Sequence, residues 1–205
     1  PEKVVRDVIY TKNHFGAFKR QLDKEPLTPA IAALLFIMFN GCRAEESILL
    51  SWEPERPGAI GWVDLEHETI EYYPELSKTR KGHRLPISYA LMPMLTQLSK
   101  AARNNWVFPG RRTNKPLSYA GLRNKHGGIL ESAGLPKYYT LHDLRRTMST
   151  YGQPIVGEAL INSLIRHAQK GQNGVYIQHP LDDLVVASAK VTDRLIEIVE
   201  GREVR

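Results

Sequence analysis

The sequence predicts a mostly α-helical domain interrupted by a small antiparallel β-sheet, an α+β fold. Two observations lead to this prediction. Apolar residues recur at helical spacing over most of the chain, and three short β-type segments separated by turns lie between these regions. A third observation is the length of 205 residues, which lets one domain bury a sizeable core without disulfides. We find no repeats and no low-complexity linker, so we expect one main domain.

The first predicted helix follows Thr28, a residue type that caps helix N-termini, and begins with Pro29, which suits the first turn. The apolar run 31–39 predicts that this helix is buried on nearly all sides and that it ends at Gly41. A second helix is expected over residues 43–50, with the apolar side chains at its end facing inward.

Strands and further helices follow in alternating blocks. Alternating β-branched and aromatic residues predict three strands, over 60–64, 69–73 and 83–87. Helical spacing then returns over 90–102, 118–133, 142–151, 159–165 and 181–199.

The charge distribution indicates a polyanionic partner. The net charge is +6, but residues 77–126 contain 11 Lys/Arg and not one Asp or Glu. An acid-free window of this length favours a phosphate backbone, and so nucleic acid, over a merely solvated lysine-rich face. The single cysteine, Cys42, excludes a disulfide framework and a CxxC site. The longest apolar run is too short for a membrane span and there is no charged-then-apolar leader, so we expect a soluble cytoplasmic protein with no membrane partner.

Four segments carry side chains suited to chemistry. His142 and Arg145 lie three residues apart on a predicted helix and share a face, although such a pair alone is more often a surface pair. Arg43 follows the buried helix, with Glu46 one turn on to hold its guanidinium. Elsewhere, Lys78 begins a hairpin turn. Two more candidates are His167 and Tyr176, which are nine residues apart.

In this order, the four segments resemble the catalytic domain of the tyrosine recombinases, the phage integrase family, of the prophage and genomic-island type. The resemblance runs from about Leu27 to about Pro180. It implies that residues 1–180 form the catalytic domain and that residues 181–205 form a C-terminal helix and tail, a segment that family members commonly pass to a neighbouring protomer. Because the chain begins at Pro1, we expect a processed form or a fragment that lacks the family's N-terminal DNA-binding domain.

The resemblance also assigns roles to the candidate residues. It implies that Arg43 is the first arginine, Lys78 the hairpin lysine, His142 and Arg145 the HxxR pair, His167 the second histidine and Tyr176 the nucleophile. There are two departures from the family pattern. Arg166 stands where the family often has glycine, and residues 151–157 contain two glycines and a proline where the pattern usually reads as continuous helix.

This set of residues fits phosphoryl transfer to a tyrosine. Two arginines can clamp the negative charge that builds on the non-bridging oxygens. A tyrosine is a weak nucleophile until His142 removes its proton, and Lys78 can protonate the leaving 5′ oxygen. His167 can donate a hydrogen bond to the same phosphate. No carboxylate cluster with metal-ligand spacing and no P-loop occur in the sequence, so we expect neither a metal nor ATP nor any other cofactor.

The sequence therefore predicts a site-specific DNA recombinase that cleaves and rejoins strands through a 3′-phosphotyrosyl intermediate, integrating or excising a mobile element. Two alternatives stay open: strand relaxation resembling that of type IB topoisomerases, and a catalytically idle DNA-binding domain of the same fold. Expected partners are double-stranded DNA, further copies of this chain in a tetramer on DNA, and accessory DNA-bending proteins. The residues expected to contact DNA phosphates are Arg80, Lys81, Arg84, Arg111, Arg112, Lys115, Arg123 and Lys125.

Overall fold

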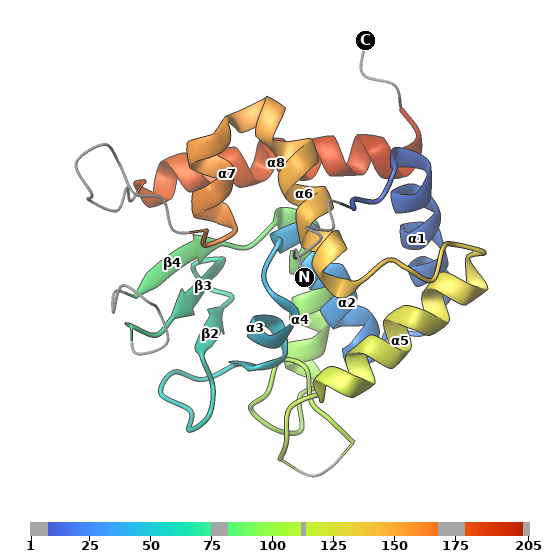
Figure 1. The fold of residues 1–205 in the computed structure, drawn as a ribbon. Helices are drawn as coiled ribbons and strands as arrows, with labels where there is room; N and C mark the ends of the chain where they lie inside the picture. Colours follow the sequence, from blue (N-terminus) through green and yellow to red (C-terminus); the bar gives the residue numbers. More distant parts are fainter. Residues whose placement is uncertain (1–7, 75–81, 112–113, 168–178, 203–205) are drawn as a thin grey trace, which may run out of the picture.

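The computed structural model describes residues 8–74, 82–111, 114–167 and 179–202. These residues form a body of helices with a small sheet at one side (Figure 1). Helix α2 (Pro29–Asn40) occupies the centre, where it contacts α1, α3, α5, α6 and α8. The predicted α+β class is confirmed.

Helix α1 (Lys12–Lys24) precedes the first helix expected from the sequence. Its N-cap is Thr11, whose hydroxyl accepts a hydrogen bond from the His14 backbone N–H at 3.2 Å. Only a narrow stripe of this helix is buried, including Phe15 and Phe18, and the stripe packs against α5 and α8. So narrow a stripe is a weak signal in the sequence, and the helix was therefore missed.

Helix α2 begins and ends where the sequence predicts. Thr28 caps it by accepting from the Ile31 N–H at 3.4 Å, and Gly41 ends it with φ of 63°. A Cβ at Gly41 would lie 2.8 Å from Met148 Sδ and 2.9 Å from Ile165 Cγ2. Glycine is therefore required here twice, for the left-handed backbone and for the close approach of α6.

The second expected helix is shorter than predicted, because α3 (Ala44–Ile48) is followed by strand β1 (Leu50–Ser51). Strand β1 pairs in parallel with β2 (Gly61–Asp64), and the strand order is β1-β2-β3-β4. The three predicted strands are present, and β3 (Thr69–Tyr72) pairs antiparallel with both β2 and β4 (His83–Pro86). The sheet is thus mixed rather than purely antiparallel, owing to an edge strand that the sequence did not reveal.

The remaining helices follow the sequence prediction closely. They are α4 (Met92–Lys100), preceded by the short 3-10 helix η2 (Tyr89–Leu91), then α5 (Tyr119–Ser132), α6 (Leu141–Val156), α7 (Glu158–Leu164) and α8 (Leu181–Glu200).

Helix α6 continues through the unusual glycine- and proline-containing stretch. Pro154 lies inside its last turn, and the helix ends at Gly157, with φ of 83°. A Cβ at Gly152 would lie 2.8 Å from Ile161 Cδ1 and 3.0 Å from Val191 Cγ1. The glycine therefore lets α7 and α8 approach α6 closely, and the helix stays continuous as in the family pattern.

Helix α8 packs on its own chain, against α1, α6, α7 and β4 (Figure 1). Its buried face includes Val191 and Leu195, both fully buried. Two polar contacts add to this packing: the Ser88 and Thr192 hydroxyls lie 2.8 Å apart, and Tyr89 donates to Asp193 at 2.5 Å. Exchange of this helix between protomers stays a prediction. In the part of the chain that the structure describes, no helix has the length and apolar character needed to cross a bilayer.

Candidate active site

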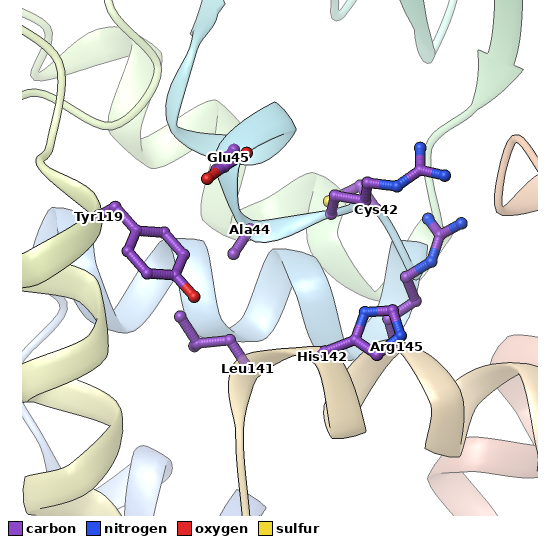
Figure 2. A pocket seen from close by; sticks show the side chains of 8 residues that line it. Cys42, Ala44, Glu45, Tyr119, Leu141, His142 and Arg145 are labelled. Atoms are coloured by element: carbon purple, nitrogen blue, oxygen red, sulfur yellow. The ribbon is translucent and has the colours of Figure 1, made fainter. Parts of the chain in front are cut away.

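A pocket of about 180 Å³ lies between the start of α6, the α2–α3 turn and the start of α5. Three of the predicted catalytic residues, Arg43, His142 and Arg145, line it together. Figure 2 shows His142 and Arg145 projecting from α6 toward the segment that carries Cys42, with Tyr119 of α5 at the other end of the pocket. The complete lining is Cys42, Arg43, Ala44, Glu45, Tyr119, Leu141, His142 and Arg145.

Arg145 is the buried arginine of the pocket, only 4% exposed. Its Nη1 donates a hydrogen bond to the carbonyl oxygen of Gly41 at 2.8 Å, which joins α6 to the C-terminal end of α2. Burial, and then the positive charge of Arg43, lower the pKa of this guanidinium. An arginine remains charged in proteins, so the pocket holds a desolvated cation that a bound anion would stabilise.

Arg43 is more exposed and is held by Glu46. It is the N-cap of α3, and Glu46 closes a capping box by accepting from the Arg43 backbone N–H at 3.1 Å. The other carboxylate oxygen of Glu46 accepts from Arg43 Nη1 at 2.7 Å. One carboxylate thus fixes both the backbone and the guanidinium of Arg43, while 47% of the arginine side chain stays exposed to a ligand.

His142 lies one residue inside α6, whose start is fixed by a capping box between Thr140 and Asp143. The Thr140 N–H and hydroxyl both donate to the Asp143 carboxylate at 2.8 Å. Burial is the largest cause that lowers the pKa of His142, and Arg145 is the next. Both causes favour the neutral imidazole, which is the form that can accept a proton.

The other predicted catalytic residues do not line the pocket or cannot be placed. His167 follows α7 with an exposed side chain, and its backbone N–H donates to the Asn162 carbonyl oxygen at 2.7 Å. Lys78 and Tyr176 lie outside the described residues.

The predicted DNA-contacting residues fall into three groups. Arg84 forms an ion pair with Glu71, and Lys125 one with Glu25, both at 2.7 Å. The hydrogen bond from Lys125 is the main cause that lowers the pKa of Glu25. Arg111, Lys115 and Arg123 are exposed, as is the ion-paired Arg84, and those outside the described residues are Arg80, Lys81 and Arg112. Contact of any of them with DNA stays a prediction.

Two residues near this pocket were not predicted from the sequence. Tyr119 is 44% exposed and lines it, but the only signal in the sequence was its place after the α5 N-cap, Ser118. Arg166, noted in the sequence only as a departure from the family pattern, contacts Glu46. Within the residues that the structure covers, no cluster of three or more His, Cys, Asp or Glu side chains could hold a metal ion.

Solved structures with a similar fold are recombinases. XerA recombinase matches over 100% of this chain and 67% of its own, with a TM-score of 0.62 and 16% identity. The integrase from mycobacterium phage Brujita matches over 99% of this chain and 60% of its own length, with a TM-score of 0.59 and 19% identity. A lambda integrase(75–356) dimer bound to a COC′ core site matches over 88% and 64%, with a TM-score of 0.60 and 13% identity. The fold is therefore that of a tyrosine recombinase catalytic domain.

The sequence comparison gives the family itself. Residues 19–180 match the sequence model of the phage integrase family, so the chain belongs to this family. Prophage integrase IntZ from Escherichia coli (strain K12) is 29% identical over 169 residues, which are 79% of this chain. The chain spans only 38% of the length of that relative.

Proposed function

We propose that this chain is the catalytic domain of a site-specific DNA recombinase, which cleaves and rejoins DNA through a 3′-phosphotyrosyl intermediate to integrate or excise a mobile element. The observation that carries the proposal is the convergence of Arg43, Arg145 and His142 on one pocket. Family membership supports the same reaction. The substrate is double-stranded DNA, and the reaction takes place in the cytoplasm.

The two arginines bind the non-bridging oxygens of the scissile phosphate. Arg145 is buried and anchored to Gly41, so it can stabilise charge without a large reorganisation when the transition state forms. Arg43 is the exposed member, and Glu46 limits the directions in which its guanidinium can point. Together they provide the positive charge that a pentacoordinate phosphorane-like state requires.

In the proposed reaction His142 acts as the base and Lys78 as the acid. The tyrosine hydroxyl gives its proton to His142 as the phenolic oxygen bonds to phosphorus. The bond from phosphorus to the 5′ oxygen breaks, and Lys78 protonates that oxygen. Rejoining reverses these steps with a 5′ hydroxyl as the nucleophile, so the phosphodiester bond is conserved and no external energy source is needed.

The nucleophile in this proposal is Tyr176, on the basis of its position in the family motif. Tyr119 is the alternative that the pocket itself offers, because it lines the pocket and its side chain is accessible. Tyr151 is not a competitor, since its hydroxyl donates to the Tyr10 carbonyl oxygen at 2.8 Å, among packed side chains.

A nicked suicide substrate tests the reaction and the nucleophile together. We expect a covalent protein–DNA adduct that maps by peptide sequencing to Tyr176 and that is absent from Tyr176→Phe. The matched control is Tyr119→Phe, which should still form the adduct. An adduct on Tyr119, or none on any tyrosine of a protein that binds the DNA, would contradict the proposal.

Assembly on DNA separates recombination from the topoisomerase-like alternative. One solved structure of similar fold is a lambda integrase tetramer bound to a Holliday junction, and by analogy we propose a tetramer of this chain on paired sites. Strand exchange between two labelled duplexes is the expected result. Relaxation of a supercoiled plasmid without any joint product would support the alternative.

A further inference from the structure

Arg166 has a backbone conformation that is unusual for its residue type. Helix α7 ends in a Schellman motif. The Arg166 N–H donates to the Ser163 carbonyl oxygen at 3.0 Å, and the His167 N–H donates to the Asn162 carbonyl oxygen at 2.7 Å. Arg166 has φ of 54°, in the left-handed region that such helix ends usually fill with glycine. A residue with a long side chain is disfavoured in this conformation.

The side chain of Arg166 is nevertheless well packed at the edge of the active site. Only 10% of it is exposed, and its guanidinium carbon lies 3.8 Å from the centre of the Tyr72 ring. Its Nη1 lies 3.4 Å from Oε1 of Glu46, the oxygen that also accepts from Arg43. The side chain thus joins the end of α7 to strand β3 and to α3.

These contacts come with several destabilising features. The Nε atom of Arg166 is buried and has no hydrogen-bond partner, and the backbone is in a disfavoured region. Arg166 also places a third guanidinium near Glu46. Arg43 and Arg145 already interact favourably with this carboxylate, so the added cation lies beside two like charges. Unfavourable local features that persist in a fold often serve a site rather than stability.

Glu46 is the point through which Arg166 can act on the reaction. One oxygen of Glu46 is fixed by the Arg43 backbone N–H, whereas the other, Oε1, is held by the half-exposed Arg43 guanidinium. A second cation from a different element, itself fixed by stacking on Tyr72, restricts the carboxylate and hence the Arg43 guanidinium. The contact also ties the residue before His167 to the same carboxylate.

We propose that Arg166 is a positioning residue for DNA cleavage: it fixes Glu46, and through it orients Arg43 toward the scissile phosphate. This rests on the proposed function, but it assigns a role to a residue at which the family often has glycine. Arg166 itself does not touch the phosphate in this proposal.

The test compares Arg166→Gly with Arg166→Lys. Glycine suits the left-handed backbone, so the protein should fold with an unchanged or higher Tm while its single-turnover cleavage rate falls about tenfold or more, since small misplacements of a catalytic group are costly. The affinity for duplex DNA should change little. Lysine keeps a cation for Glu46 and should recover part of the rate.

Two further variants serve as a control for the left-handed position and as a test of action through Glu46. Glu68→Gly removes a side chain from another left-handed position, in the exposed turn between β2 and β3, and should leave cleavage unchanged. If Arg166 acts through Glu46, then Glu46→Gln combined with Arg166→Gly should cleave no more slowly than Glu46→Gln alone. Effects that multiply, or an Arg166→Gly protein that cleaves at the original rate, would overturn the proposal.

A readout without catalysis separates this proposal from the proposed function. Relaxation of the Arg43 side-chain Nε, measured by NMR, should show greater mobility in Arg166→Gly and no change in Glu68→Gly. An unaltered Arg43 would refute the role of Arg166 even if the protein cleaves DNA. Failure of the original protein to form any adduct would refute the proposed function, and the mobility of Arg43 would still decide whether Arg166 fixes it.

Discussion

The candidate active-site pocket can be compared with a cluster formed by Tyr10, His126 and Tyr139. Each of these two regions contains a histidine whose pKa lies below its usual value. In the cluster, burial lowers the pKa of His126 to about 4, and its Nε2 lies 2.7 Å from the Tyr10 hydroxyl. In the pocket, burial lowers the pKa of His142 and neighbouring arginines lower it further. The same direction of shift thus arises in two different surroundings.

The difference lies in what else surrounds each imidazole. Tyr10 stacks on Tyr139 with ring centres 3.9 Å apart, and the Tyr139 hydroxyl lies 2.9 Å from His14 Nδ1, so the cluster is closed and its polar groups are paired. The pocket is lined by two arginines, and 47% of the Arg43 side chain stays exposed although Glu46 pairs with it, so an outside anion can still reach this cation. A histidine with a lowered pKa is therefore part of the packed interior in the first region, whereas in the second it lines a pocket that also contains two arginines.

The largest effect that this comparison predicts is on cleavage. Arg145→Ala and Arg43→Ala should each reduce the cleavage rate by about 10²–10³-fold, because each removes a donor to the charge of the transition state. Duplex affinity should remain nearly intact, since the acid-free window 77–126 still provides phosphate contacts.

Quenched suicide-substrate assays and gel shifts measure the two quantities separately. Arg103→Ala is the matched control, because it removes the same charge from an exposed residue that does not line the pocket. Equal losses of binding and cleavage in Arg145→Ala would show that this arginine is structural instead.

A smaller effect is expected on stability at acid pH. His126 has a folded-state pKa of about 4, below its usual 6.5, so the unfolded chain binds more protons between these values. The contribution of the neutral His126 to the free energy of unfolding should therefore be complete above about pH 6.5. The free energy of unfolding should fall by up to about 3 kcal/mol as the pH drops to 4. Urea unfolding at several pH values measures this. His126→Gln should lose this part of the pH dependence, and an unchanged slope in that variant would contradict it.

The smallest effect concerns the Tyr10 hydroxyl. Tyr10→Phe leaves the buried His126 nitrogen without its partner, so the free energy of unfolding should fall by about 1–3 kcal/mol, with no change in the cleavage rate of folded protein. A cleavage defect in Tyr10→Phe would mean that the two regions are coupled, for which Asp143 is the candidate because its charge influences both histidines.

Much of the fold could be predicted from the sequence because its signals are local. The cap at Thr28, the apolar run of α2 and the glycine at its end act within a few residues of one another, and the structure confirms all three. Strand β1 could not be predicted in this way. Its two residues form a strand because the Leu49 carbonyl oxygen accepts from the Ile60 N–H and that of Leu50 from Val107, both at 3.0 Å.

The same distinction applies to the site. The sequence by itself determined which residues could do the chemistry, since Arg43 with Glu46, and His142 with Arg145, are each close neighbours in a motif. Only the tertiary structure decided that Arg43 shares one pocket with His142 and Arg145, and that Arg166 reaches Glu46 and Tyr72. The reason is physical: spacing along a helix fixes which side chains share a face, whereas the meeting of distant faces depends on how helices pack around α2.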